Sequence, residues 1–474
     1  MSQWQPLHEI ADNVRAGKLK ASELVSRSLE TISDKAEYQA IIATMAERAK
    51  ERAAAVDQQV AANQPVGRLA GVPFIAKDNF LVYGAETTAA SNILRGFMAP
   101  YQATVINRLE AEGAICVAKA NLDAFAHGAS TENSDFFVTK NPHDKSRVPG
   151  GSSGGSAAGV VLDMAPFAVG TDTGGSVRQP ASFVGCVGYK PTYGLMSRSG
   201  IVAMASSTDT VGVLANNIED ASLVIDVMAG KDELDGTTIE RSDQPYTDLS
   251  GEINGKKIAV IKEYMGEGLD QLVKERINMA IVKLKNSGAV VSEVSLPSLQ
   301  LSLAVYYIVC PAEVSSNLSR YDGQRFGYSF EGAKKLDESY MKTRQHGFGK
   351  EAKRRIMIGT YVLSSGYYDA YYKKAQTVRT KLINEFNEVF KQVDFLVGPV
   401  TPTTAFKIGE NTSDPLKMYL ADVLTVGPSL VGIPAVSIPA GLVNGLPVGL
   451  QLMAPQLKDS ELLSVAKAAE GIIS

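Results

Sequence analysis

The sequence predicts an α/β protein built around a sheet that helices cover on both faces. Three observations support this class: helical segments alternate with strands, the predicted strands are short and continuously apolar, and glycines stand where helices should end. A strand that is apolar on both sides is buried on both sides, which requires a helical layer on each face of the sheet. The composition, 45% hydrophobic and 21% charged in 474 residues, is ordinary for a globular protein.

The chain begins with a helical segment that extends to about residue 65. Leu7, Ile10 and Val14 form one apolar stripe at helical spacing, and residues 24–32 carry a second stripe. Ser22 is the expected N-cap of the second helix, because its hydroxyl can accept a hydrogen bond from a free backbone N–H.

A helix, a glycine and an apolar strand follow one another twice. Residues 104–112 predict a helix that ends at Gly113, and residues 114–118 predict the strand after it. The second unit has an extra strand in front: strand 258–261, a helix over 270–287 that ends at Gly288, and strand 289–294.

Two polar segments are predicted to be loops, residues 234–256 and residues 404–415. Residues 423–457 carry no charge, which raises the question of a membrane span. Five prolines interrupt this segment, so short buried strands and turns are the better prediction.

Charge and cysteine content exclude several classes of function. The net charge is −4 and there is no basic stripe, so we do not expect this chain to hold a nucleic acid by itself. The cysteines, Cys116, Cys186 and Cys310, form no CxxC pair, which argues against a disulfide framework or a zinc site and favours buried apolar positions. No charged head followed by an apolar segment opens the chain, so we expect no signal peptide, and a cytoplasmic protein.

Two glycine-rich stretches each contain a candidate catalytic serine, Ser152 within residues 150–156 and Ser176 within residues 170–176. Neither stretch has the Gly-Lys-Ser/Thr ending of a nucleotide-binding P-loop. A serine nucleophile needs a base, yet none of the four histidines lies in these stretches. Each stretch alone could equally be a tight turn before a helix.

Lys77 is the candidate base, because it lies in an apolar run and burial favours the neutral form of a lysine. Position alone favours an ordinary lysine at a strand end. The backbone N–H groups of Thr173, Gly174 and Gly175 precede Ser176 and could form an oxyanion hole, which stabilises charge on a carbonyl oxygen.

Both stretches, together with residues 188–194, resemble the amidase signature family over nearly the whole chain. The resemblance implies the catalytic set Ser176, Ser152 as a serine with a cis peptide bond, and Lys77, with no metal. It also implies one amidase domain over residues 1–474 with a large mixed sheet, in place of the two or three domains that length suggests. Its parts would be a catalytic core of about 66–233, the loop at about 234–256 and a C-terminal half of about 257–474.

Residues 312–323 and 363–372 resemble the branch of that family that hydrolyses glutamine for tRNA-dependent amidotransferases. The resemblance implies that Arg355 and Asp422 hold the α-carboxylate and α-ammonium of glutamine; the residue pattern alone makes Arg355 an exposed helix position. It implies no cofactor in this chain, a partner B subunit that uses ATP and Mg²⁺ on charged tRNA, and a small C subunit. The tRNA would be Glu-tRNA(Gln), Asp-tRNA(Asn) or both, and no membrane is involved.

The chain departs from the family pattern at two places. Ala124 replaces a glutamate and His127 replaces a common methionine, for which we expect a structural role. Gly427, Pro428 and Ser429 replace a Pro-Ala/Val-Asn run after Asp422. These departures bear on the substrate pocket or on the exit of ammonia.

Two other functions stay open on the sequence: a free-standing amidase for another small amide, and a scaffold without activity. Residues 312–323 and 363–372 argue against the first, and the intact Lys77, Ser152 and Ser176 argue against the second.

Overall fold

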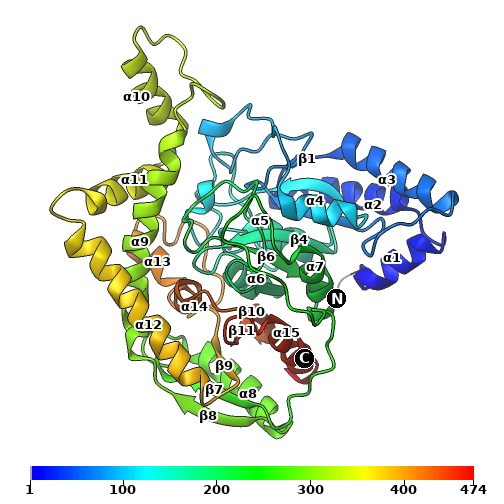
Figure 1. The fold of residues 1–474 in the computed structure, drawn as a ribbon, viewed down its shortest axis with the longest axis vertical. Coiled ribbons are helices and arrows are strands. Elements are labelled where there is room, and N and C mark those ends of the chain that lie inside the picture. Colours follow the sequence, from blue (N-terminus) through cyan, green and yellow to red (C-terminus); the bar gives the residue numbers. More distant parts are fainter. Residues whose placement is uncertain (1–2, 474) are drawn as a thin grey trace.

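The computed structural model describes residues 3–473 and contains a single sheet of 11 strands that runs through the molecule (Figure 1). The strand order is β1-β3-β2-β4-β6-β5-β10-β11-β9-β7-β8. The strands are β1 (Ile41–Thr44), β2 (Pro73–Lys77), β3 (Ile115–Ala120), β4 (Phe167–Asp172), β5 (Val187–Lys190), β6 (Thr210–Ala215), β7 (Lys257–Ile261), β8 (Val290–Val294), β9 (Phe395–Pro399), β10 (Ala435–Val443) and β11 (Leu446–Met453).

The sheet is mixed, as predicted. β2 pairs in parallel with β3 and β4, and β7 pairs in parallel with β8 and β9, whereas the other neighbours are antiparallel. Strands from both sides of the 234–256 loop therefore share one sheet. β10 and β11 form a hairpin whose turn contains Asn444 and Gly445, both with positive φ, as a two-residue hairpin turn requires.

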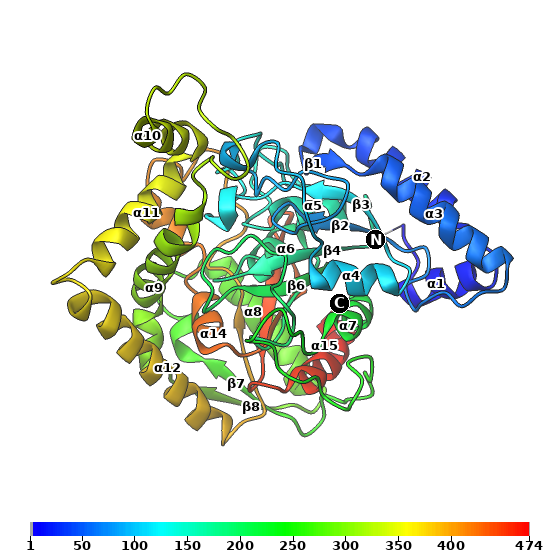
Figure 2. The same cartoon turned by 45° about the horizontal axis from the view of Figure 1, so that its top comes forward.

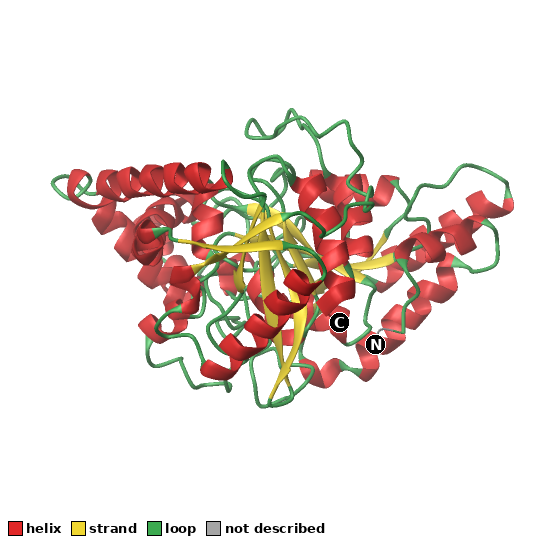
Figure 3. Ribbon diagram, turned by 90° about the horizontal axis from the view of Figure 1, so that it is seen from below, coloured by secondary structure: helices red, strands yellow, loops and turns green. Residues whose placement is uncertain are grey.

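Helices cover both faces of the sheet, which confirms the predicted class (Figure 3). Figures 1 and 2 place α1–α3 at one side of the molecule and α9–α12 at the opposite side. The helices are α1 (Leu7–Arg15), α2 (Ala21–Asp34), α3 (Ala46–Ala61), α4 (Thr104–Ala111), α5 (Gly154–Val161), α6 (Arg178–Val184), α7 (Ile218–Met228), α8 (Gln271–Asn286), α9 (Ser302–Asn317), α10 (Leu336–Gly347), α11 (Lys350–Leu363), α12 (Lys374–Phe390), α13 (Pro415–Leu420), α14 (Val426–Val431) and α15 (Asp459–Ile473).

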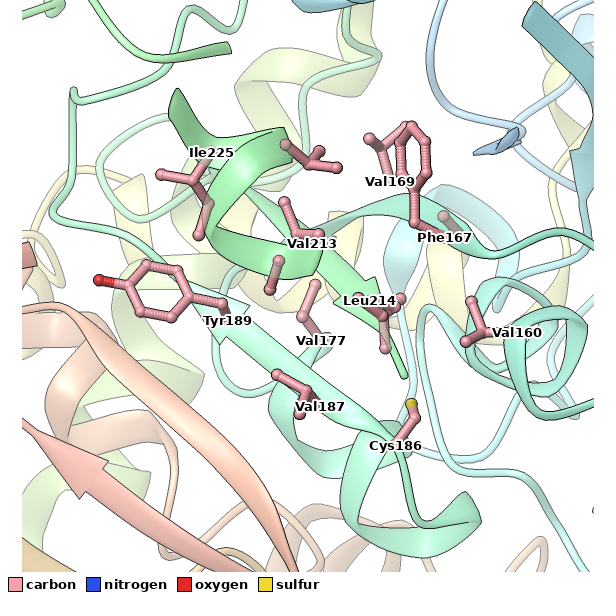
Figure 4. Packing of buried hydrophobic residues seen from close by; sticks show 14 of the residues in the cluster. Val160, Phe167, Val169, Val177, Cys186, Val187, Tyr189, Val213, Leu214 and Ile225 are labelled. Carbon is pink, nitrogen blue, oxygen red and sulfur yellow. The ribbon is translucent and has the colours of Figure 1, made fainter. Parts of the chain in front are cut away.

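The strands contribute side chains to two apolar layers, one on each face of the sheet, because successive residues of a strand point to opposite faces. In β7, Ile258 and Val260 pack with α8 and α15, whereas Ala259 and Ile261 pack with α9 and α12. Figure 4 shows the first layer near β4, where Phe167 and Val169 belong to the same buried cluster as Val213 of β6 and Ile225 of α7. The three cysteines are buried, as predicted.

Three local predictions were wrong. Ser22 lies inside the first turn of α2, where its Oγ donates to Asp57 at 2.6 Å, and Lys20 holds the N-cap position. Ala168 and Val169 predict the end of a strand before Gly170, whereas β4 continues through Gly170 to Asp172, because Gly170 and Thr171 pair with β6. Residues 426–431 form α14 rather than a strand or turn, since Pro428 occupies its first half, where a missing N–H costs least.

Within residues 3–473, no helix combines the length and the apolar character needed to cross a bilayer.

Candidate active site

The sheet brings Lys77, Ser152 and Ser176 to one edge. Lys77 is the last residue of β2, and β4, its parallel neighbour, ends at Asp172. Parallel strands end at the same edge of a sheet, which is where α/β proteins bind ligands. Ser152 precedes α5, Ser176 precedes α6, and the N–H of Ser153 donates to the carbonyl of Ser176 at 3.1 Å.

The Lys77 amine lies in a cluster of hydroxyl groups. Its Nζ is 2.8 Å from Oγ of Ser152, 2.8 Å from Oγ of Ser153 and 2.9 Å from Oγ1 of Thr171. A hydroxyl can donate as well as accept, so this cluster can solvate a neutral amine that takes a proton. Ser153 and Thr171 were missed by the sequence analysis, although both lie within the two glycine-rich stretches.

Burial lowers the pKa of Lys77 to about 7, against the opposing effect of the Asp123, Asp172 and Asp209 carboxylates. The side chain has no exposed surface, and loss of water disfavours an ammonium ion. A large fraction of Lys77 is therefore neutral at physiological pH and able to accept a proton.

The two serines differ in exposure. Ser152 has no exposed surface, whereas 6% of Ser176 is exposed. The peptide bond between Gly151 and Ser152 is cis, as the family resemblance implied. Of the three residues, only Ser176 reaches the surface, which suits a nucleophile in front of a buried base and a buried relay.

The turn before Ser176 presents free backbone N–H groups. Within residues 3–473, the N–H groups of Thr173, Gly174 and Ser176 have no hydrogen-bond partner. The N–H of Gly175 instead donates to Oδ1 of Asp172 at 2.9 Å. We therefore remove Gly175 from the predicted oxyanion donors and keep Thr173, Gly174 and Ser176.

A buried ion pair fixes this turn. Oδ1 of Asp172 lies 2.9 Å from Nη2 of Arg178, and neither side chain is exposed. Burial alone would raise the pKa of Asp172, but the Arg178 guanidinium reverses the effect and the pKa is lowered. Arg178 also donates to Gln451 and to Ser429, so one of the residues that departs from the family pattern belongs to this network.

Arg355 is buried, so its assignment to an exposed helix face was wrong. Only 2% of the residue is exposed. Its Nε donates to Glu351 at 2.9 Å, and its guanidinium lies 5.4 Å from the Tyr307 ring and 5.8 Å from the Tyr419 ring. The sequence gives no signal for this, because the tyrosines that cover Arg355 come from α9 and α13.

A pocket of about 60 Å³ opens beside Arg355. Of the predicted site residues, Arg355 lines this pocket, whereas Ser176 and Asp422 do not. The lining residues are Gly128, Ala129, Glu132, Asn133, Tyr307, Glu351, Arg354, Arg355, Asn411, Thr412, Pro415, Met418 and Tyr419.

Asp422 is a buried carboxyl without a partner. Its Oδ1 is buried and makes no hydrogen bond within the described residues 3–473. Burial, followed by the nearby Asp172 carboxylate, raises its pKa well above the ordinary value. A Cβ placed on Gly175 would lie 3.4 Å from this oxygen, so Asp422 lies against the residue that precedes Ser176. Such a group suits a ligand with an ammonium ion.

His127 has no exposed surface, and neither ring nitrogen has a partner in the part of the chain that the structure describes. Burial lowers its pKa well below the ordinary value, so the ring is neutral. Its structural role remains a prediction. Gly427, the first of the departures after Asp422, lets Leu299 and the Tyr264 hydroxyl approach closely.

The chain is similar to known proteins over almost its full length. A family model described as "Amidase" matches residues 23–463. The chain is 49% identical over 467 residues to the A subunit of glutamyl-tRNA(Gln) amidotransferase from Lacticaseibacillus paracasei, with 98% of this chain and 96% of that protein covered. The protein of the same name from Geobacillus kaustophilus is 49% identical over 464 residues, covering 98% and 96%.

Solved structures agree with these matches. The crystal structure of the A subunit of glutamyl-tRNA(Gln) amidotransferase from Thermotoga maritima has a TM-score of 0.79 and 40% identity, covering 97% of this chain and 93% of that chain. A bacterial aryl acylamidase of the amidase signature family has a TM-score of 0.88 at 22% identity, covering 99% and 96%, which shows a shared fold.

Proposed function

The chain belongs to the amidase family, and we propose that it is the A subunit of an aspartyl/glutamyl-tRNA amidotransferase, which hydrolyses glutamine. The structural observation that carries the proposal is the 2.8 Å contact between Nζ of the buried Lys77 and Oγ of Ser152. The relatives described above are named for the same amidotransferase.

In the proposed mechanism, neutral Lys77 accepts a proton from Ser152, which takes one from Ser176. Oγ of Ser176 attacks the side-chain amide carbon of glutamine, and the carbonyl oxygen becomes an oxyanion. The N–H groups of Thr173, Gly174 and Ser176 donate to that oxyanion. The proton returns through Ser152 to the amide nitrogen, the C–N bond breaks and ammonia leaves. Water then releases glutamate from Ser176 by the same proton path.

Arg355 and Asp422 would select the substrate. Free glutamine carries one α-carboxylate and one α-ammonium, and each of these two residues offers the opposite charge. The position of Arg355 in the pocket lining and the unpartnered Oδ1 of Asp422 support this assignment.

We further propose that the ammonia passes to the B subunit of the complex, which uses ATP and Mg²⁺ to activate Glu-tRNA(Gln), Asp-tRNA(Asn) or both. A small C subunit would stabilise the pair, and the complex would work in the cytoplasm with no cofactor in this chain. The net charge of −4 supports contact with tRNA through the B subunit rather than through this chain.

Ser176→Ala should abolish glutamine hydrolysis and leave the fold intact, because the change removes one hydroxyl and creates little cavity. Ser156→Ala is the matched control: this buried serine of the first stretch bonds to the Val169 carbonyl and not to Lys77. The measurement is ammonia release, with mass spectrometry for a glutamyl adduct. An adduct on the Ser176→Ala protein would refute the nucleophile.

Asp422→Asn should lower kcat/KM for glutamine far more than kcat/KM for glutaramate, which lacks the α-ammonium group. A lost charge-assisted contact costs about 1.5–3 kcal/mol, roughly ten- to a hundredfold in kcat/KM. Both substrates are compared in both proteins. An equal loss on the two substrates would mean that Asp422 does not recognise the ammonium group.

A glutaminase assay with and without partners tests the whole assignment. We expect hydrolysis of glutamine to rise when charged tRNA is added together with the B and C subunits. For a free-standing amidase, the rate of hydrolysis would not change when the partners are added. A scaffold would hydrolyse no glutamine with or without them.

A further inference from the structure

We propose that Gln179 and Thr131 tie the wall of the substrate pocket to the segment that carries Ser152, and are positioning residues for the proton relay. We call these two residues the brace. The inference rests on the proposed role of Ser152 in the preceding section.

The pocket wall and the relay segment are neighbours in space. Gly128, Ala129, Glu132 and Asn133 line the pocket beside Arg355. Residues 150–154 lie behind that wall, with Ser152 in the middle. Ser152 Oγ lies 2.8 Å from Lys77 Nζ, and the proposed relay also requires it to reach the Ser176 hydroxyl. An error of about 1 Å can cost a hundredfold in rate.

Gln179 bridges the two segments with both ends of its side-chain amide. Its Nε2 donates to the carbonyl of Ala129 at 2.9 Å, and its Oε1 accepts the N–H of Gly151 at 2.8 Å. The side chain has no exposed surface, so no water can replace a lost partner. The residue next to Ser152 is thereby fixed relative to the pocket wall.

Thr131 forms hydrogen bonds to the backbone of residues 150–154 on both sides of Ser152. Its Oγ1 donates to the carbonyl of Gly150 at 2.7 Å and accepts the N–H of Gly154 at 3.2 Å. The backbone of Thr131 has a φ of 64°, a conformation that a threonine rarely adopts without support.

Asp123 supplies that support. Its carboxylate accepts the N–H groups of Thr131 at 2.8 Å and Asn133 at 3.0 Å. A Cβ on Gly151 would lie 2.2 Å from its Oδ2, so the carboxylate also presses against the residue before Ser152. Asp123 is kept out of the test below, because its charge acts on Lys77 as well.

The test replaces Gln179 with methionine, which keeps the length and removes both hydrogen bonds. Two lost hydrogen bonds at a relay should lower kcat for glutamine by about ten- to a hundredfold, with KM changed less than about threefold. Gln102→Met is the matched control: Gln102 is buried, and its amide bonds to Tyr83 and Glu110 away from the site. Its kcat should stay within about twofold of wild type.

A double-mutant cycle separates positioning from general damage. If the brace acts through Ser152, Gln179→Met should cost less than about twofold in a Ser152→Ala background. The same fold-loss in both backgrounds, or a wild-type kcat for folded Gln179→Met, would overturn the proposal. Thr131→Val repeats the cycle if Gln179→Met does not fold.

The same cycle distinguishes failure of the brace from failure of the proposed function. Ser152→Ala with wild-type hydrolysis would refute the relay itself. An inactive Ser152→Ala beside a fully active Gln179→Met and Thr131→Val would refute only the brace.

Discussion

In the proposed mechanism, one buried lysine, Lys77, takes the place of a catalytic histidine. The end of β2 removes the amine from water, and three hydroxyl groups surround it. Burial lowers its pKa to about 7, close to the ordinary value of an imidazole. The reactivity of the site therefore depends on the balance between burial and the nearby carboxylates.

kcat/KM for glutamine should rise with pH through about 7, because protonated Lys77 cannot accept a proton. Asp123, Asp172 and Asp209 raise this pKa. Burial raises the pKa of Asp123 to about 6, so this carboxylate is ionised above that pH. Asp123→Asn removes its charge and should move the midpoint down by about half a unit to one unit.

Asp220→Asn is the matched control for this shift, since Asp220 is a buried carboxyl with a pKa also raised to about 6, near α1 and away from the site. Its midpoint should equal that of wild type. Lys77→Arg should be inactive at every pH, because arginine does not deprotonate. Identical midpoints in Asp123→Asn and wild type would contradict the electrostatic argument.

A candidate site residue can be recognised from the sequence when the residues next to it in the chain are unusual. Lys77, Ser152 and Ser176 stand in apolar or glycine-rich segments, and the structure brings them together. Arg355 is covered by rings from α9 and α13, and such distant contacts leave no mark on the residues around it. The family resemblance assigned Arg355 to the binding of glutamine, and that role stays a prediction.

The turn between β4 and α6 is the element on which the site depends. Gly174 packs against Tyr306 of α9, and Gly175 packs against Thr425 before α14. The turn is thus held between two helices from the second half of the chain. These close contacts restrict the backbone that carries the N–H groups of the turn.

Gly175→Ala should abolish activity and destabilise the protein. Its φ is 141°, and a Cβ would lie 2.1 Å from Oγ1 of Thr425, so strain and overlap together should cost about 3 kcal/mol or more. Gly445→Ala is the control, with a φ of 79° and open space, for which about 1 kcal/mol is expected. Equal losses in unfolding free energy would contradict the packing argument.

Element boundaries were predictable where the chain carries its own stop signal. The helix predicted over 270–287 is α8, residues 271–286, because Gly288 ends it. The end of β4 was missed, since pairing with β6, and not local composition, extends the strand to Asp172. α14 was not predicted, because Gly427, Pro428 and Gly432 lie in or next to it and such residues are typical of turns.

Across the whole molecule, Arg178 connects the two halves of the chain. It bonds to Asp172 in the first half and to Thr425, Ser429 and Gln451 in the second. Length alone suggested two or three domains, yet strands from both halves share one sheet. That the chain forms one domain stays a prediction. In such a domain, the buried Asp172–Arg178 ion pair links the two halves of the chain.

Arg178→Met should lower the unfolding free energy by about 3–5 kcal/mol, because it leaves the Asp172 carboxylate buried and unpaired. The loss is measured by thermal unfolding at one scan rate. Lys391→Met is the control: its pair with Glu388 is largely exposed, so no change in the midpoint is expected. If the thermal unfolding midpoint of Arg178→Met equals that of wild type, the Asp172–Arg178 ion pair does not stabilise the fold as proposed.

The proposed role of Asp422 couples the binding of substrate to the stability of the folded chain. Without a ligand, this buried group lacks a partner among residues 3–473, and burial favours its protonated form. In the proposed role of Asp422, an arriving ammonium ion would lower this pKa again, and a proton would leave as the amino acid enters. Ligand that binds only the folded chain also protects it from unfolding. Under the proposed role of Asp422, loss of substrate would therefore leave the folded chain less protected against unfolding and proteolysis.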